Sequence, residues 1–341
     1  MLDRSSHTSR RTYLKAVGAA SVAGLAGCLG DDSDLPTVNT AYVVAGGNKP
    51  SLFEIDELRE EVAENDGDVY DLEVENIGST PDHVTAVSAG EVQIAMSTVG
   101  SLPSAIIQDA VEGGVTAVAS DYVDGHTDHY AIGTWTAEDS DIESAADLEG
   151  RTVGVNAEGT GVHAIVVREL HNHGLTEDDV NWAEFPFPGI QTAIDEENID
   201  AGIVPSTFAG VMRMDGGYRM IFDSHDAFGQ SYPFTYLFVG NDYLEDNEEL
   251  VEAYLEDYSA LVDYILDPDN RDDVIDMLVE QFDAPHDVYD HVLYTENDYY
   301  HPNPPELDVD GLQTAVDDLA EMGFIDEQVD MAPHVDNSYL P

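Results

Sequence analysis

The sequence predicts an α/β fold built from wound sheets, and three observations support this. Short segments rich in β-branched residues alternate with segments whose apolar residues recur at helical spacing. Apolar residues make up 43% of the chain and aromatic residues 9%, which is enough for packed cores and too much for a disordered acidic chain. The length of 341 residues exceeds the roughly 250–300 at which a single core stops growing, so two domains are expected.

The first half of the chain supplies most of the expected strands. The first strand is expected at residues 38–44, before the glycine loop 45–48, and a helix follows from Ser51 to about Gly67. A second strand at 72–77 leads to a helix that Thr80 caps and that ends at Gly90, with Pro81 in its first turn. Further strands are expected at residues 92–96, 115–119, 130–135, 152–155, 181–185, 199–204, 218–222 and 234–239.

The last third of the chain shows helical patterns without strands. An apolar stripe at helical spacing runs through residues 250–265, and further helices are expected at 274–282 and 312–322. We therefore expect this tail to pack back onto a domain that the earlier strands have formed.

The charge of the chain is strongly negative. Lys and Arg number 11 against 71 Asp and Glu, a formal net charge of −60, which excludes the basic surface that nucleic-acid binding requires. The acidic residues are scattered along the chain, and Lys49 is the only lysine beyond residue 15. Such a charge destabilises a compact state unless concentrated salt screens it. The pattern indicates a halophilic, archaeal source rather than an acidic binding tail, which would need a block of charge.

Residues 1–27 have the features of an export leader. Arg10 and Arg11 precede a short apolar run of small residues at 16–26, as in twin-arginine signals, which export folded proteins. The run ends in Leu25-Ala26-Gly27-Cys28, which resembles a lipobox, so Cys28 is the expected lipidation site; a free structural cysteine is the alternative. Residues 28–37 read as a polar tether. Removal of the leader leaves 7 basic and 70 acidic residues, a net charge of −63.

Five short segments occur in the order found in a known family. They are VTAVSAGEVQIAM at 84–96, IESAADLEGRTVGV at 142–155, GLTEDDV at 174–180, Ala193-Ile194 and Ile199-Asp200-Ala201. Together they resemble solute-binding proteins of the nitrate/sulfonate/taurine class of ABC importers, the SsuA/TauA or NMT1/THI5-like class. The resemblance covers most of residues 38–265. The first helix departs from the family, because Ser51-Leu52-Phe53 stands where an Ala-rich start is usual.

The resemblance implies a type II periplasmic-binding-protein fold, in which two α/β lobes are joined by two crossover strands and the ligand lies between them. Lobe one is then expected at residues 38–128 plus 240–341 and lobe two at 129–239. The crossovers are expected near 130–133 and 234–237.

Loops after the strands supply the candidate ligand contacts, because ligands of open α/β sheets bind beyond the carboxyl ends of strands, near helix N-termini. The candidates on these loops are Asn48, Lys49, Ser97, Thr98, Gly159, Thr160, Gly161 and Ser206. Lys49 is expected to face an anion, and Thr160 and Ser206 also fit helix caps. Tyr232 is a candidate for an apolar wall, with Tyr122, Phe185, Phe187 and Phe228, although most aromatic residues are simply core.

With the export leader, the resemblance implies an extracytoplasmic solute-binding component of an ABC importer. It is expected to be a monomer, tied to the outer face of the membrane, that captures a small organic anion and delivers it to a permease and its ATPase. No P-loop, Gly-x-Ser-x-Gly or His-Glu-x-x-His motif occurs, so neither an enzyme nor a cofactor is expected. The histidine pairs His126/His129 and His171/His173 have no cysteines or matching pair beside them, so no metal is expected. A THI5-like protein that binds or makes a pyrimidine precursor and an extracellular sensor domain are the alternatives.

Overall fold

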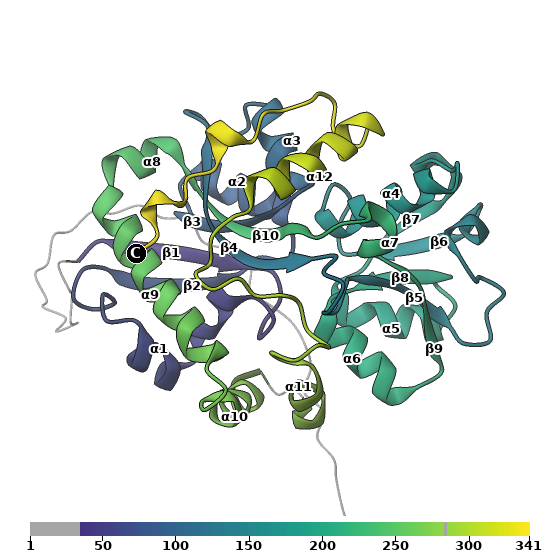
Figure 1. Cartoon of the computed structure of the whole chain (residues 1–341), viewed down its shortest axis with the longest axis horizontal. Coiled ribbons are helices and arrows are strands. Elements are labelled where there is room, and N and C mark those ends of the chain that lie inside the picture. Colours follow the sequence, from purple (N-terminus) through teal and green to yellow (C-terminus); the bar gives the residue numbers. More distant parts are fainter. Residues whose placement is uncertain (1–34, 283–284) are drawn as a thin grey trace, which may run out of the picture. The chain divides into compact units, whose positions relative to one another are not determined.

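The computed structural model describes residues 35–282 and 285–341 (Figure 1). The leader and Cys28 lie outside these described residues. The unit Leu35–Pro341 contains two five-stranded mixed sheets, each with helices packed around it. None of the described helices is both long enough and apolar enough to cross a membrane.

The first sheet has the strand order β2-β1-β3-β10-β4. Its parallel part consists of β1 (Thr37–Tyr42), β2 (Asp71–Asn76) and β3 (Ile94–Thr98). Strand β10 (Tyr232–Gly240) runs antiparallel between β3 and β4 (Val115–Asp124), and all nine of its residues are buried. A fully buried apolar strand of this kind needs partners on both edges, which β3 and β4 provide.

The second sheet repeats this plan with the order β7-β6-β8-β5-β9. Its parallel strands are β6 (Thr152–Val155), β7 (Asn181–Glu184) and β8 (Ala201–Val204). Strand β5 (Gly133–Ala137) runs antiparallel to both β8 and β9 (Tyr218–Asp223). We call the first sheet with its helices lobe one and the second sheet with its helices lobe two.

The position of β10 corrects the expected lobe boundary. The sequence placed residues 129–239 in lobe two, but residues 232–239 pair with β3 and β4 in lobe one. The chain therefore crosses between the lobes at 125–132 and again at 224–231, which contains the short helix α7 (Ser224–Phe228), rather than at 234–237.

Helices cover the faces of both sheets (Figure 1). Around the first sheet lie α1 (Asp56–Val62), α2 (Thr80–Ala89), α3 (Ser101–Ile107), α8 (Asn241–Asp246), α9 (Glu248–Leu266), α10 (Arg271–Phe282) and α12 (Val309–Glu321). Around the second lie α4 (Gly161–Asn172), α5 (Phe187–Asp195) and α6 (Ser206–Asp215). The helical tail is thus confirmed. Helix α11 (His286–Val292), however, packs on α6 of lobe two, where Val288 and Val292 close over Gly210.

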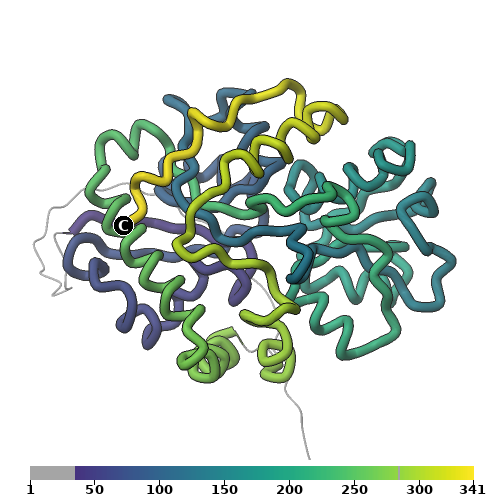
Figure 2. Tube along the Cα trace, in the orientation of Figure 1, coloured from purple at the N-terminus to yellow at the C-terminus, as the bar shows by residue number. Residues whose placement is uncertain are grey.

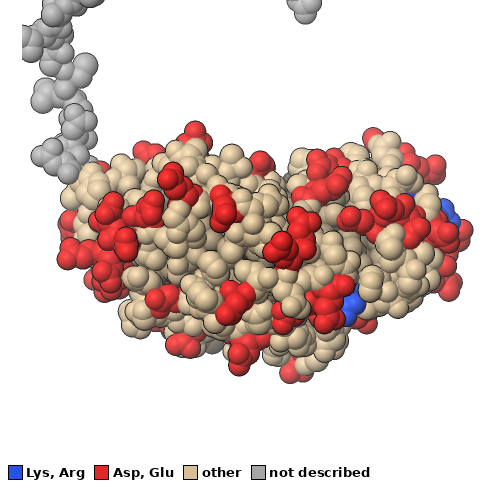
Figure 3. All heavy atoms as spheres, turned by 90° about the horizontal axis from the view of Figure 1, so that it is seen from above, with Lys and Arg blue, Asp and Glu red and all other residues tan. Residues whose placement is uncertain are grey.

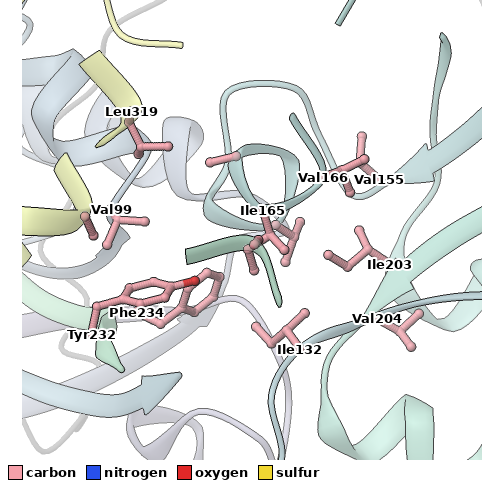
Figure 4. Packing of buried hydrophobic residues seen from close by; sticks show 14 of the residues in the cluster. Val99, Ile132, Val155, Ile165, Val166, Ile203, Val204, Tyr232, Phe234 and Leu319 are labelled. Carbon is pink, nitrogen blue, oxygen red and sulfur yellow. The ribbon is translucent and has the colours of Figure 1, made fainter. Parts of the chain in front are cut away.

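Alternation along the strands gives the first sheet two apolar faces. In β10, Phe234, Tyr236 and Phe238 belong to one buried cluster, while Leu237 and Val239 belong to the other, the period of two expected for a strand. The cluster that contains Phe234 also runs through lobe two, from Leu319 and Val99 past Ile165 to Ile203 (Figure 4). One apolar core therefore connects the two sheets.

Two local expectations near the strand ends were wrong. The helix expected from Ser51 is divided into a 3₁₀ helix at Lys49–Glu54 and helix α1, because Ile55 between them is extended, with φ −89° and ψ 102°. Ser79, not Thr80, caps α2 by accepting a hydrogen bond from the Asp82 N–H, which leaves the Thr80 hydroxyl free of that role.

A strap of residues 294–305 leads from α11 back toward α12 and passes the lobe junction (Figure 2). The Val123 N–H donates to the Tyr300 carbonyl at 2.9 Å, and the Tyr130 N–H donates to the Asp298 carbonyl at 2.9 Å. The strap therefore contacts β4 and the first crossover.

Candidate functional site

A small cavity of about 30 Å³ lies between the two lobes, with room for about two water molecules. Lobe one contributes Val43, Val44, Asn48, Thr80, Thr98, Tyr122, Phe234 and Thr235 to its wall. Lobe two contributes Asn156, Thr160, Gly161, Val162, Phe187 and Pro205. The strand-end loops of both sheets thus converge on the cavity, as expected for a ligand site of wound sheets.

The lobes touch directly beside this cavity. A Cβ atom built on Gly161, the first residue of α4, would lie 2.7 Å from the Phe234 ring and 2.8 Å from Thr98 Cβ. Only a glycine leaves room for the two lobes at this distance. The small volume of the cavity and this contact together describe a closed cleft.

A larger groove of about 600 Å³ adjoins the cavity and shares Val43, Val44 and Phe187 with it. Its wall combines the end of β1, the loop before α5, helix α6 and the tail helices. The aromatic side chains in this wall are Tyr42, Phe187, Phe208, Phe282 and Tyr289. The cavity and groove therefore form one concave region with a narrow inner end and a wide apolar outer part.

Lys49 does not offer its charge to this region. Its side chain is 2% exposed, and its Nζ donates to the Asp121 carbonyl and lies 3.4 Å from Asp121 Oδ1 and 2.9 Å from His301 Nδ1. Burial lowers the pKa of Lys49, while the charge of Asp121 acts in the opposite direction. The sequence predicts that Lys49 faces an anionic ligand, but Lys49 is paired with Asp121 inside the protein. Lys49 is also not part of the cavity wall.

Four of the expected contact residues lie in the cavity wall, namely Asn48, Thr98, Thr160 and Gly161. The Thr160 hydroxyl caps α4 by accepting from the His163 N–H and donates to the Ala157 carbonyl at 2.8 Å. The Asn48 amide accepts from the Val44 N–H at 2.7 Å and donates to Asp121 Oδ2 at 2.9 Å. Both side chains shape the wall, and protein partners hold both of them in place.

Like Lys49, the remaining four expected residues lie outside the wall. Ser97 Oγ is 2.8 Å from Ser101 Oγ, and the Gly159 N–H donates to His163 Nδ1 at 3.0 Å. Ser206 does not cap α6; its hydroxyl donates to Asp298 Oδ1 at 3.0 Å, on the strap. The Tyr232 ring packs 4.6 Å from that of Phe228 inside the core.

Sequence reasoning missed several wall residues. Thr80 and Thr235 are the most informative, because both carry hydroxyls. Thr80 was assigned to a cap, and Thr235 sits on the strand β10 that was placed in the wrong lobe. The Thr235 hydroxyl donates to Asp121 Oδ2 at 3.1 Å, whereas the buried Thr80 hydroxyl has no hydrogen-bond partner. Of the aromatic candidates, Tyr122 and Phe187 line the cavity, and Phe185 and Phe228 do not.

Two histidines near the cleft are neutral. Burial lowers the pKa of His163 and that of His83 to about 4, so neither imidazole supplies a positive charge at neutral pH. Among the described residues no group of three or more His, Cys, Asp and Glu side chains is arranged to hold a metal ion.

Known structures share the two-lobed arrangement. The periplasmic aliphatic sulphonate binding protein SsuA from Escherichia coli is 19% identical, with 87% of this chain and 91% of that chain aligned at a TM-score of 0.64. The nitrate-binding protein NrtA from Synechocystis PCC 6803 is 11% identical over 90% of this chain and 87% of that one, with a TM-score of 0.69. The desulfurization enzyme DSZB is 15% identical over 89% and 97%, with a TM-score of 0.60. The chain has the type II periplasmic-binding-protein fold.

Sequence comparison gives the family. No curated protein sequence matches the chain. The family model described as NMT1/THI5 like matches residues 70–271, which is more than half of the chain. The chain belongs to the NMT1/THI5-like family.

Proposed function

We propose that the chain is the extracytoplasmic solute-binding component of an ABC importer, which captures a small organic solute between its two lobes and delivers it to a permease and its ATPase. The closed cleft supports this most directly, because residues of both lobes form one cavity wall and the lobes touch at Gly161, Phe234 and Thr98. Two lobes that close on a ligand are a common device for capture and release.

The expectation of an anionic solute, of the sulfonate, nitrate or taurine kind, was based on the family resemblance and on Lys49 together with hydroxyls and N–H groups of the strand-end loops. The internal ion pair of Lys49 with Asp121 removes the one basic side chain from this set, whereas Thr98 and Thr160 lie in the cavity wall.

A binding experiment tests the proposal. The purified protein in concentrated salt is screened by thermal shift against a library of small solutes, because a ligand of the folded state raises the free energy of unfolding by RT ln(1 + [L]/Kd). A solute that binds must also be recovered unchanged after prolonged incubation, since the proposal is a carrier and not an enzyme. Chemical conversion of the solute by the protein would instead favour catalysis, as in DSZB.

We propose further that the mature protein begins at Cys28, is lipidated there after twin-arginine export and faces the outside of the cell as a monomer. The sequences Arg10-Arg11 and Leu25-Ala26-Gly27-Cys28 support this. Replacement of Cys28 by Ser is expected to release the protein into the medium or to leave it unprocessed, as cell fractionation and mass spectrometry would reveal. Replacement of Ser33 by Ala, within the expected tether, serves as the matched control. Unchanged membrane retention and unchanged mass of the Cys28 variant would contradict lipidation.

We also propose that the chain is adapted to concentrated salt, as in halophilic archaea. The net charge of −63 after residue 27 supports this, because such a charge is tolerated where salt screens it.

A further inference from the structure

We propose that the solute of this cleft is an uncharged organic molecule, whose apolar body lies in the groove and whose polar end contacts the Thr80 hydroxyl in the cavity. This inference rests on the proposed solute-binding function and names the chemical class of the solute. It follows from the charges around the cleft, from the hydrogen bonds of its wall and from one unpartnered hydroxyl.

The described wall of the cavity and groove differs in charge from the other hollows of this protein. No Asp, Glu, Lys, Arg or His is present among the described residues that line the cavity and the groove. The hollow beside α1, in contrast, is lined by Asp56, Arg59, Glu60 and Glu64 among others. Another, beside α9, includes Glu61, Asp263 and Asp267. In a chain with 71 acidic residues, a wall whose described residues carry no charge and include several aromatic rings is suited to apolar solutes.

The positive charges of the chain have other partners. Seven basic residues follow residue 27, and none of them lines the cavity or groove. Five of them bond to carboxylates, to an amide or to carbonyl oxygens: Arg59 to Asp66, Arg151 to Asp141, Arg168 to Asn172, Arg219 to the Glu138 carbonyl and Arg271 to Asp290. Arg213 lies 5.1 Å over the Tyr130 ring, and Lys49 is paired with Asp121. A bound anion would have no cationic side chain opposite it.

Most polar side chains of the wall already form hydrogen bonds with other groups of the protein. Thr98 Oγ1 lies 3.0 Å from Ser101 Oγ, and the hydroxyls of Thr160 and Thr235 donate to Ala157 and Asp121. An oxyanion with three oxygens needs several donors at once, and a buried oxygen left without one is costly. These side chains offer few free donors to sulfonate or nitrate.

One buried hydroxyl in the wall has no hydrogen-bond partner within the described protein. Thr80 is 4% exposed and lines the cavity, and its Oγ1 is unpaired. Buried polar atoms in folded proteins are nearly always paired, so an unpaired one at a ligand cavity indicates that the ligand supplies the partner. A single hydroxyl fits one amide, carbonyl or hydroxyl group of a solute whose remainder is apolar.

Matched pairs of probes test this inference. Each pair shares one skeleton: benzamide with benzoate, hexanamide with hexanoate, and methyl phenyl sulfone with benzenesulfonate. In calorimetric titrations at about 2 M KCl, where the Debye length is about 2–3 Å, the uncharged member is expected to bind at least about tenfold more tightly, a difference of about 1.4 kcal/mol. Equal or tighter binding of the charged members would overturn the inference and leave solute binding in place. If no member of any pair binds, the inference fails, and the library screen described above decides the proposed function separately.

Variants in the wall make the test specific. Thr80→Val removes the hydroxyl and keeps the branched shape, and it is expected to weaken binding of the uncharged probe about 3- to 10-fold, one hydrogen bond, without lowering the melting temperature. Thr80→Ser keeps the hydroxyl and is expected to retain the affinity. Val211→Asp introduces a carboxylate into the groove and is expected to weaken binding at least tenfold, whereas Val69→Asp, at a residue 37% exposed outside the groove, is not. Undiminished affinity in both Thr80→Val and Val211→Asp would place the probe elsewhere and overturn the inference.

Discussion

Asp124 is a buried carboxylate at the point where the chain leaves the first sheet. Its side chain is 0% exposed, and Oδ1 accepts hydrogen bonds from the Gly125 N–H at 2.8 Å and the Ile132 N–H at 3.0 Å. No basic side chain forms an ion pair with Asp124 among the described residues. Burial therefore raises the pKa of Asp124 to about 7, although the backbone hydrogen bonds and the nearby Ser224 hydroxyl lower it in part.

This shift predicts a specific pH dependence of stability. The folded protein keeps the Asp124 proton up to about pH 7, while the unfolded chain releases it near pH 4, so the folded state binds more protons in between. The contribution of Asp124 to stability therefore falls as pH rises through this window and reaches a penalty on the order of 4 kcal/mol above it. Asp124→Asn is expected to gain stability over the wild type progressively between pH 4 and 7, in urea denaturation at constant high salt. A difference that does not vary with pH would contradict this, and Asp178→Asn, at an exposed site, is the control.

Single residues show how far the sequence alone can lead. The Thr160 cap was predictable because it depends on neighbours three residues away, the His163 N–H among them. The roles of Lys49 and Ser206 were not, because their partners Asp121 and Asp298 are 72 and 92 residues distant in the chain. Contacts between residues close in the sequence can be predicted from it. The partner of a buried charge often lies far away in the chain and is known only once the fold is known.

At the scale of elements, the N-terminus of α4 sets how closely the lobes approach. Gly161 begins this helix, and its Cα faces Phe234 of β10 and Thr98 of β3. A side chain at this position collides with lobe one only when the cleft is closed. It therefore destabilises the closed state and leaves the stability of each lobe unchanged.

Gly161→Val is therefore expected to weaken binding of any cleft ligand at least about tenfold, because the added methyl groups overlap Phe234 and Thr98 and oppose closure. The melting temperature without ligand is expected to change by only a few degrees. Calorimetry with the solute that the library screen identifies provides the measurement. Gly189→Ala in α5, where the nearest atom to a new Cβ is 4.0 Å away, controls for an added side chain. An unchanged affinity of Gly161→Val would show that closure at this contact is not needed.

The elements themselves were largely predictable, since β-branched runs and apolar stripes are local signals. The tail stripe at 250–265 corresponds to α9, and the strands of both sheets lie within a few residues of their expected ranges. The sequence could not predict the lobe to which β10 belongs, because a mostly apolar strand does not indicate which strands it pairs with. The break at Ile55 was missed because Leu52, Ile55 and Leu58 keep a helical period across it.

At the scale of the whole molecule, acidic residues far outnumber basic residues on the surface. Figure 3 shows Asp and Glu side chains scattered over the visible face among other residues, with few Lys or Arg. Like charges at this density repel one another over distances that depend on the salt concentration.

Stability is therefore expected to fall as the salt is diluted. At about 1 M KCl the Debye length is near 3 Å, whereas at about 0.1 M it is near 10 Å and neighbouring carboxylates repel. Circular dichroism and tryptophan fluorescence are expected to report unfolding over this range for the protein with a net charge of −63. Sucrose in place of KCl serves as the control. Like many salts, sucrose stabilises proteins because it is excluded from their surface, but it carries no charge and cannot screen the carboxylates. A stability that stays flat across the dilution would contradict adaptation to salt.

The place of β10 in the first sheet also orders events during synthesis. The second sheet is complete once Asp223 has left the ribosome, but the first sheet lacks the strand between β3 and β4 until Gly240 has emerged. Lobe two can therefore fold as a unit before β4 has a partner on either edge. Unpaired strands are prone to aggregate during this interval. If export follows the proposed twin-arginine route, which carries folded proteins, translocation has to wait until the second half of the chain has closed the sheet that the first half began.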